Sequence, residues 1–79
     1  MQINVKYFAA LRECAGVSSE FLEVQPCKVE EVYNLLNAKY CFPVDKKLLK
    51  VAINEEYCDF EDLLKNGDVL VFVPPVAGG

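Results

Sequence analysis

The end of the chain has the clearest potential for chemistry, because two prolines and two small residues lead there into a pair of glycines. These residues are Pro74, Pro75, Val76, Ala77, Gly78 and Gly79. Glycine has no Cβ, so other groups can approach its backbone more closely than that of any other residue. A terminus of this kind can be threaded through a narrow channel of an activating enzyme to its reactive centre. We therefore expect the carboxylate of Gly79 to be the reactive group, with Gly78 keeping the channel passable.

A C-terminal carboxylate is inert until it is activated, for instance as an acyl-adenylate made from ATP. Attack by a sulfur nucleophile would then leave a thiocarboxylate, and attack by an amine would leave an amide. The alternative is a terminus that ends in glycine by chance, which at a glycine usage of about 7% happens in roughly 0.5% of chains. Pro74 and Pro75 favour the functional interpretation, because neither donates a backbone hydrogen bond and both favour an extended exit from a domain.

Cysteine is the other residue type with reactive potential, and it occurs at positions 14, 27, 41 and 58. The four are well separated, no C-x-x-C pair occurs and histidine is absent, which argues against a metal site. An even count permits disulfides, but no secretory signal accompanies it. We expect reduced thiols that act mostly as small buried apolar groups.

The composition fits one small globular domain. The 79 residues are 53% hydrophobic and 25% charged, with a net charge of -4. The negative charge argues against nucleic acid as the main partner and favours a basic protein partner. No apolar run approaches the roughly 20 residues that span a bilayer. Because residues 1–6 alternate like a strand rather than forming a signal peptide, a cytoplasmic protein is expected.

The first half of the chain predicts two strands and two helices. Residues 2–8 and 20–24 have strand patterns, and residues 9–15 favour a short helix that Gly16 ends. Residues 29–40 have the clearest helical pattern. Its apolar stripe comprises Val29, Val32, Tyr33, Leu36 and Tyr40.

The second half predicts three more strands. Residues 48–54 form one, residues 57–58 a short one, and the apolar run 69–73 suits a central strand covered on both faces. Between them, residues 60–64 could form one helical turn capped by Asp59, and a tight turn is expected at 65–68. The element order predicts an α+β protein, a β-grasp (ubiquitin-like) domain over residues 1–74 with a flexible tail over 75–79.

Four segments carry a resemblance to a known family. They are Tyr7-Phe8-Ala9-Ala10-Leu11-Arg12-Glu13 with Gly16, Val51-Ala52-Ile53-Asn54, Asn66-Gly67-Asp68, and the ending from Phe72 to Gly79. Over its whole length the chain resembles the small subunits of molybdopterin synthase, which are β-grasp sulfur carriers. Related carriers for thiazole synthesis share the Gly-Gly end but generally lack the Phe-Ala-x-x-Arg-Glu segment and the double proline.

The resemblance implies a reaction cycle in which this chain is a sulfur-donating subunit without catalytic groups of its own. An ATP-dependent activating enzyme of the ubiquitin-activating type adenylates Gly79, and a sulfur donor converts it to a thiocarboxylate. The tail then enters the large synthase subunit and gives sulfur to cyclic pyranopterin monophosphate, which builds the molybdopterin dithiolene. Two small and two large subunits form the implied heterotetramer, and this chain binds neither a cofactor nor a metal.

The resemblance also implies a docking surface beside the tail. By position it comprises Phe8, Tyr57 and Val73, while Pro75, Val76, Ala77 and Gly78 enter the partner. For Phe8 the alternative is simple core packing. Two other functions use the same activated terminus: a ubiquitin-like protein modifier, and a sulfur carrier for thiazole, cysteine or tRNA thiolation.

Overall fold

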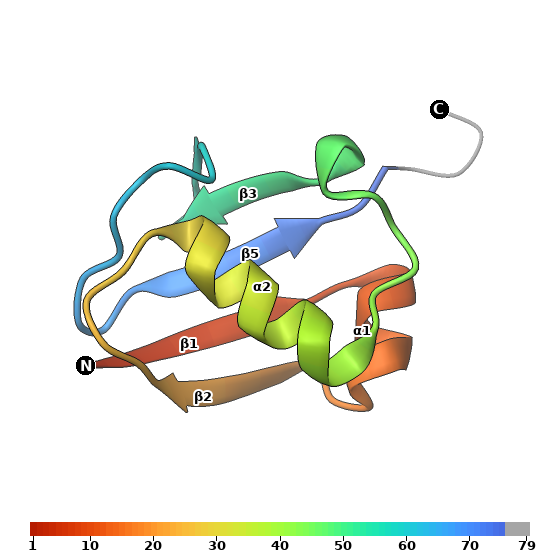
Figure 1. Cartoon of the computed structure of the whole chain (residues 1–79), viewed down its shortest axis with the longest axis horizontal. Helices are drawn as coiled ribbons and strands as arrows, with labels where there is room; N and C mark the ends of the chain where they lie inside the picture. The colour runs from red at the N-terminus through yellow and green to blue at the C-terminus, as the bar shows by residue number, and fades with distance from the viewer. Residues whose placement is uncertain (76–79) are drawn as a thin grey trace.

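In the computed structural model, which describes residues 1–75, a five-stranded mixed sheet carries one long helix across one of its faces (Figure 1). The elements are β1 (Gln2–Tyr7), α1 (Ala9–Ala15), β2 (Ser19–Glu23), α2 (Val29–Tyr40), the 3-10 helix η1 (Lys46–Leu48), β3 (Lys50–Ile53), β4 (Glu56–Cys58) and β5 (Val69–Val73). The strand order is β2-β1-β5-β3-β4. The predicted β-grasp architecture is confirmed.

Strand β5 occupies the centre of the sheet, as its apolar sequence predicted. It pairs in parallel with β1, from Asn4 opposite Val69 to Tyr7 opposite Phe72. On its other side it pairs antiparallel with β3. The first and last strands of the chain therefore run side by side and end at the same edge of the domain.

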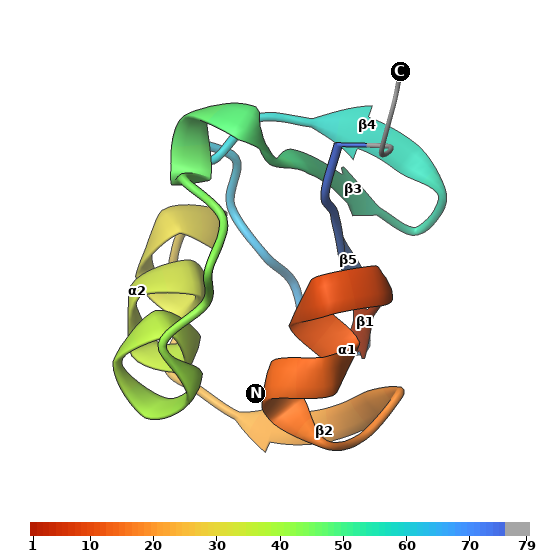
Figure 2. The same ribbon diagram turned by 90° about the vertical axis from the view of Figure 1, so that its right-hand side faces the viewer.

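Helix α2 covers one face of the sheet through the stripe that its sequence predicted (Figure 2). Val29, Val32, Tyr33 and Leu36 are buried against the sheet. The first turn is acidic, which suits the positive end of the helix dipole. There the Glu31 carboxylate accepts a 2.8 Å hydrogen bond from the Lys28 backbone N–H. At the other end Cys41 adopts a left-handed conformation with φ 54°, which stops the helix.

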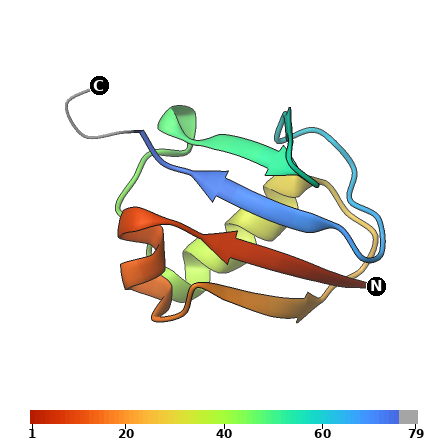
Figure 3. The ribbon, with the colours of Figure 1, turned by 180° about the vertical axis from the view of Figure 1, so that it is seen from behind.

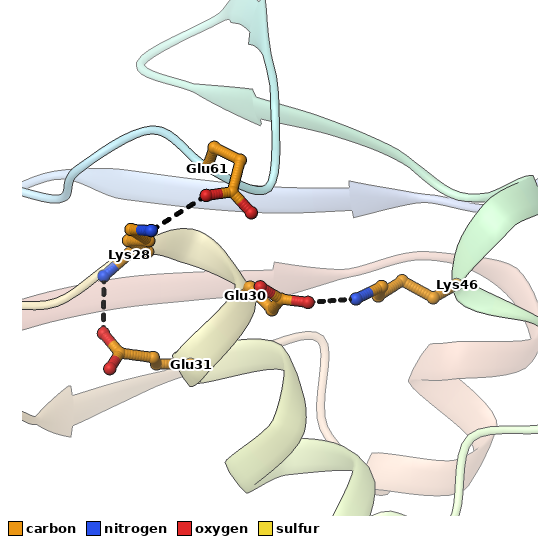
Figure 4. Close-up of polar contacts among 5 residues, drawn as sticks. All are labelled: Lys28, Glu30, Glu31, Lys46 and Glu61. Atoms are coloured by element: carbon orange, nitrogen blue, oxygen red, sulfur yellow. Dashed lines mark hydrogen bonds and ion pairs between the residues drawn. The ribbon is translucent and has the colours of Figure 1, made fainter.

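Ion pairs attach the start of α2 to two later segments (Figure 4). The Lys28 ammonium lies 2.8 Å from a Glu61 carboxylate oxygen. Lys46 of η1 pairs with Glu30 of α2. All four side chains are at least one-third exposed, so water screens these pairs and each stabilises the fold only modestly.

The opposite face of the sheet is open (Figure 3). Leu70 and Phe72 of β5 point toward α2 and are fully buried. Val69, Val71 and Val73 alternate with them and are half-buried on the open face. The prediction that both faces of this strand are covered is therefore wrong. The open face therefore presents apolar side chains without a helix over them.

Two local predictions in the second half are also corrected. The predicted strand 48–54 begins later, because Leu48 ends η1, Leu49 caps it and β3 starts at Lys50. No helical turn forms at residues 60–64: residues 60–62 are a turn and a bend, and Leu63 makes an isolated antiparallel bridge with Lys28. Asp59 does not cap a helix with its side chain; instead its N–H donates a 2.8 Å hydrogen bond to the Asp62 carboxylate.

The cysteines are not core residues. Cys14 and Cys41 are exposed, Cys27 and Cys58 are half-buried, and all four are free thiols. The prediction that they are mostly buried is wrong. Within residues 1–75, no three His, Cys, Asp or Glu side chains come together in a way that could hold a metal ion. Of the helices described, none has the length and apolar character that a membrane span requires.

Candidate functional site

The candidate site lies where β1 and β5 end. Because these strands are parallel and Tyr7 pairs with Phe72, two residues lie at the same edge: Phe8, which follows β1, and Val73, the last residue of β5. Helix α1 begins at this edge as well (Figure 3). Topology thus brings the root of the predicted tail next to the motif that opens α1, although the two are more than sixty residues apart in sequence.

An open apolar hollow of about 520 Å³ occupies this edge. We call it the apolar hollow; its lining residues are Phe8, Ala9, Ala10, Val44, Val73, Pro74 and Pro75. None of these side chains is ionisable. The hollow can therefore bind apolar groups of a partner, but its lining provides no general acid, general base or nucleophile.

Phe8 is presented to solvent by the turn between β1 and α1. Its backbone is extended, with φ -130° and ψ 153°, and it stands as the N-cap of α1. Its carbonyl accepts a 3.1 Å hydrogen bond from the Leu11 N–H. The side chain is 48% exposed, which contradicts the core-packing alternative. An aromatic ring half in water beside a hollow is typical of an interface anchor.

Ala9, the next residue, has φ 50°, a left-handed conformation that is uncommon for a residue with a Cβ. Such conformations cost on the order of 1–3 kcal/mol and persist where the surrounding structure enforces them. Ala9 lines the apolar hollow. The hollow is therefore built on a strained backbone segment.

Tyr57 lies on β4, two strands from β5. Ala52 of β3 pairs with Tyr57 on one side and with Val71 on the other, so these three side chains share the open face of the sheet. Tyr57 is 75% exposed. It lines a separate hollow of about 430 Å³ and not the apolar hollow.

The predicted site residues are thus brought together in part. Phe8, Val73 and Pro75 line one hollow, and Tyr57 belongs to the same face at a different place. The predictions for Val76, Ala77, Gly78 and Gly79 lie outside the described residues. Sequence reasoning missed Val44, which follows α2 in an irregular segment and lines the hollow. No pattern in the sequence marks it.

A second feature that the sequence did not reveal is a half-buried hydrogen-bond acceptor, the carboxylate of Glu20. One oxygen of Glu20, Oε2, accepts hydrogen bonds from the phenols of Tyr7 and Tyr40, both 2.6 Å long. These residues come from β2, β1 and α2, so one carboxylate joins three elements. The Lys39 ammonium lies 4.0 Å from the other oxygen of Glu20.

Electrostatics favour the ionised form of Glu20. Burial acts to raise its pKa, but the two phenol hydrogen bonds and the charge of Lys39 lower the pKa by more. The net result is a pKa below the ordinary value. Burial and the bond to Glu20 raise the pKa of Tyr7, which therefore stays protonated and remains a donor.

A family model and a curated relative both match nearly the whole chain. The model of the ThiS family matches residues 5–79. The molybdopterin synthase sulfur carrier subunit of Haemophilus influenzae is 39% identical over 98% of this chain and 99% of its own length.

Two solved structures show the same architecture. The small archaeal modifier protein 1 of Methanosarcina acetivorans superposes with a TM-score of 0.77 at 30% identity, covering 99% of this chain and 96% of that one. A chain from the complex of subunits 1 and 2 of the molybdopterin-converting factor of Helicobacter pylori gives a TM-score of 0.72 at 26% identity, with both chains fully covered.

Proposed function

The chain belongs to the ThiS family, and from this premise we propose that it is the sulfur carrier subunit of a molybdopterin synthase. The observation that carries the proposal is the full-length relationship to the Haemophilus influenzae carrier subunit. The match extends through the Gly-Gly end of the sequence. The apolar hollow supports it, because a carrier needs a docking surface at the root of its tail and has no need for catalytic groups there.

The proposed chemistry takes place at the carboxylate of Gly79. One carboxylate oxygen attacks the α-phosphorus of ATP on an activating enzyme, which releases pyrophosphate and leaves an acyl-adenylate. Hydrosulfide supplied by the sulfur donor then attacks the carbonyl carbon and displaces AMP, so the terminus becomes a thiocarboxylate. The thiocarboxylate sulfur then attacks a carbon of the pterin precursor, cyclic pyranopterin monophosphate, and displaces an oxygen leaving group from it. Water hydrolyses the resulting thioester, which restores the carboxylate and leaves the sulfur on the precursor. In this scheme the chain holds no cofactor, and ATP is a substrate of the activating enzyme.

The partner in the last step is the large subunit of the synthase. The Helicobacter pylori relative was solved in complex with its subunit 2, which supports the same kind of partner here. We assign the contact to Phe8, Val73 and Pro75, whose side chains meet at the apolar hollow. Burying an exposed aromatic anchor in a partner is a common source of affinity at protein interfaces. The acid and base groups of the reaction then come from the large subunit.

A second candidate function is a ubiquitin-like protein modifier. The relationship to the small archaeal modifier protein of Methanosarcina acetivorans favours it. Both functions begin with the same acyl-adenylate, and they differ in the group that attacks it. A sulfur nucleophile gives a carrier, whereas a lysine amine gives an isopeptide bond.

Affinity purification from the native cell separates the two functions. An N-terminally tagged chain, which leaves the Gly-Gly end free, should recover a non-covalent large subunit that is released in denaturant. A denaturant-resistant ladder of conjugates, with Gly79 joined to lysines, would instead support the modifier and contradict the carrier.

A further inference from the structure

Three chain segments that are remote in sequence line the apolar hollow: residues 73–75 at the end of β5, and two further walls. One of these walls is Phe8, Ala9 and Ala10, which directly follow Tyr7. The other is Val44, four residues after Tyr40. Each of these two walls thus begins close to one of the two tyrosines whose phenols donate to Glu20.

The contacts around Glu20 are suited to fixing these segments relative to each other. Tyr7 is 1% exposed, so its ring has little freedom. The rings of Tyr7 and Tyr40 meet edge to face with centroids 6.0 Å apart. Phe42, between Tyr40 and Val44 in sequence, packs against both rings at 6.2 and 6.0 Å. Because the hydrogen-bond acceptor is ionised, both phenol bonds are charge-assisted and stronger than bonds between neutral groups.

The strained backbone at Ala9 is a second reason why the neighbouring segments must be held in place. A left-handed alanine relaxes to an ordinary conformation unless the chain on both sides of it is held. On its C-terminal side the first turn of α1 holds it, and Leu11 of that helix is fully buried. On its N-terminal side Tyr7 holds it, through the sheet, the core and the bond to Glu20.

We propose that Glu20 is a positioning residue for partner docking: by accepting both phenols on one oxygen, it keeps these two walls of the apolar hollow in the arrangement that the partner binds. The proposal rests on the proposed function, because it takes the hollow as the docking surface. Glu20 itself does not line the hollow. Its effect on binding is exerted through Tyr7 and Tyr40.

The test compares three variants of the full chain with one control. Glu20→Leu removes the acceptor, Glu20→Gln keeps a neutral acceptor, and Tyr40→Phe removes one donor. The control is Val32→Ala, which destabilises the buried face of α2 but changes neither the hollow nor the Glu20 contacts. Affinity for the purified large subunit is measured for each folded variant, and NMR records the chemical shifts of Phe8, Ala9 and Val44 without the partner.

We expect Glu20→Leu to weaken docking by about tenfold, in line with the loss of charge-assisted hydrogen bonds. Tyr40→Phe should weaken docking by about threefold, and Glu20→Gln should recover most of the affinity. The shifts of Phe8, Ala9 and Val44 should move in Glu20→Leu and stay in place in Val32→Ala. If Glu20→Leu does not fold, the comparison of Tyr40→Phe with Val32→Ala decides.

Two results would overturn the inference. One is unchanged docking and unchanged shifts in the folded Glu20 or Tyr40 variants. The other is an equal loss of affinity in Val32→Ala, which would mean that general destabilisation explains the effect. Failure of the unaltered chain to bind the large subunit is a different outcome, because it contradicts the proposed function itself.

Discussion

Tyr7 of β1 and Phe72 of β5 face each other in the parallel pair at the middle of the sheet. Both side chains are buried, so the residues after them, Phe8 and Val73, are directed toward the open face. This register explains why the motif at the start of α1 and the root of the Gly-Gly tail form one surface. A partner that binds at this edge would contact Phe8 and Val73 together.

The exposure of Phe8 predicts that its ring contributes to binding more than to folding. Phe8→Ala should lower the free energy of unfolding by no more than about 1 kcal/mol, because the ring is half in water. Docking to the large subunit should weaken by about tenfold or more, as expected for an aromatic anchor. Urea unfolding and calorimetric titration measure the two effects.

Phe21→Ala is the matched control, because Phe21 is also an exposed phenylalanine on this sheet but does not line the apolar hollow. The affinity of Phe21→Ala for the large subunit should stay within about twofold of that of the unaltered chain. Equal losses in the two variants would contradict a role for the hollow.

Neighbouring leucines of α2 test the assignment of its buried face. Leu36 is fully buried and Leu35 is 51% exposed. Leu36→Ala should destabilise the fold by about 2–5 kcal/mol, because it removes apolar contacts and leaves a cavity. Leu35→Ala should change stability by less than about 1 kcal/mol. Chemical denaturation of both variants measures the difference, and equal values would show that the helix faces the sheet differently.

The lowered pKa of Glu20 predicts a specific acid sensitivity. A carboxyl group whose folded pKa is depressed stabilises the fold above its unfolded pKa, here near 4.5, and loses that contribution as the pH falls through the folded value. The unaltered chain should therefore lose stability relative to Glu20→Gln as the pH decreases from about 5 to 3.

Urea denaturation at a series of pH values measures this difference. A stability difference between the two proteins that stays constant across the range would show that the phenol bonds do not favour the ionised carboxylate.

Much of the fold was predictable because local patterns and tertiary packing agree. The stripe of α2 has helical spacing, and its bounds match the structure. Gly16 ends α1 with φ 79°, as a glycine after a helix predicts. Gly67 has φ 88° in the predicted turn, for the same steric reason.

The remaining features depend on long-range packing that no local pattern contains. The apolar run of β5 suggested two covered faces, but one face stays open because α2 packs on the other. Val44 and Glu20 have no distinctive neighbours in sequence. Their roles follow from where α2 ends against β1 and β2. Phe8 was predicted at the docking surface from a resemblance, and its exposure agrees with that position.

The end of the chain provides a direct genetic test. Deleting Gly79, or adding one residue after it, should abolish sulfur transfer, because the reactive carboxylate is then removed or displaced from the activating centre. Neither change affects a core residue, so the circular dichroism spectrum and the urea midpoint should match those of the unaltered chain. Sulfur transfer in a reconstituted synthase reports the outcome, and activity in either variant would contradict the proposed use of Gly79.

The proposed carrier function depends on the conversion of the Gly79 carboxylate to a thiocarboxylate. Intact-protein mass spectrometry of the chain, isolated together with its native activating system and sulfur donor, tests it most directly. We predict a mass increase equal to the exchange of one oxygen for one sulfur, located at Gly79 by fragmentation and absent when ATP is withheld. An unmodified terminus under conditions where the activating enzyme consumes ATP with this chain would contradict the carrier function.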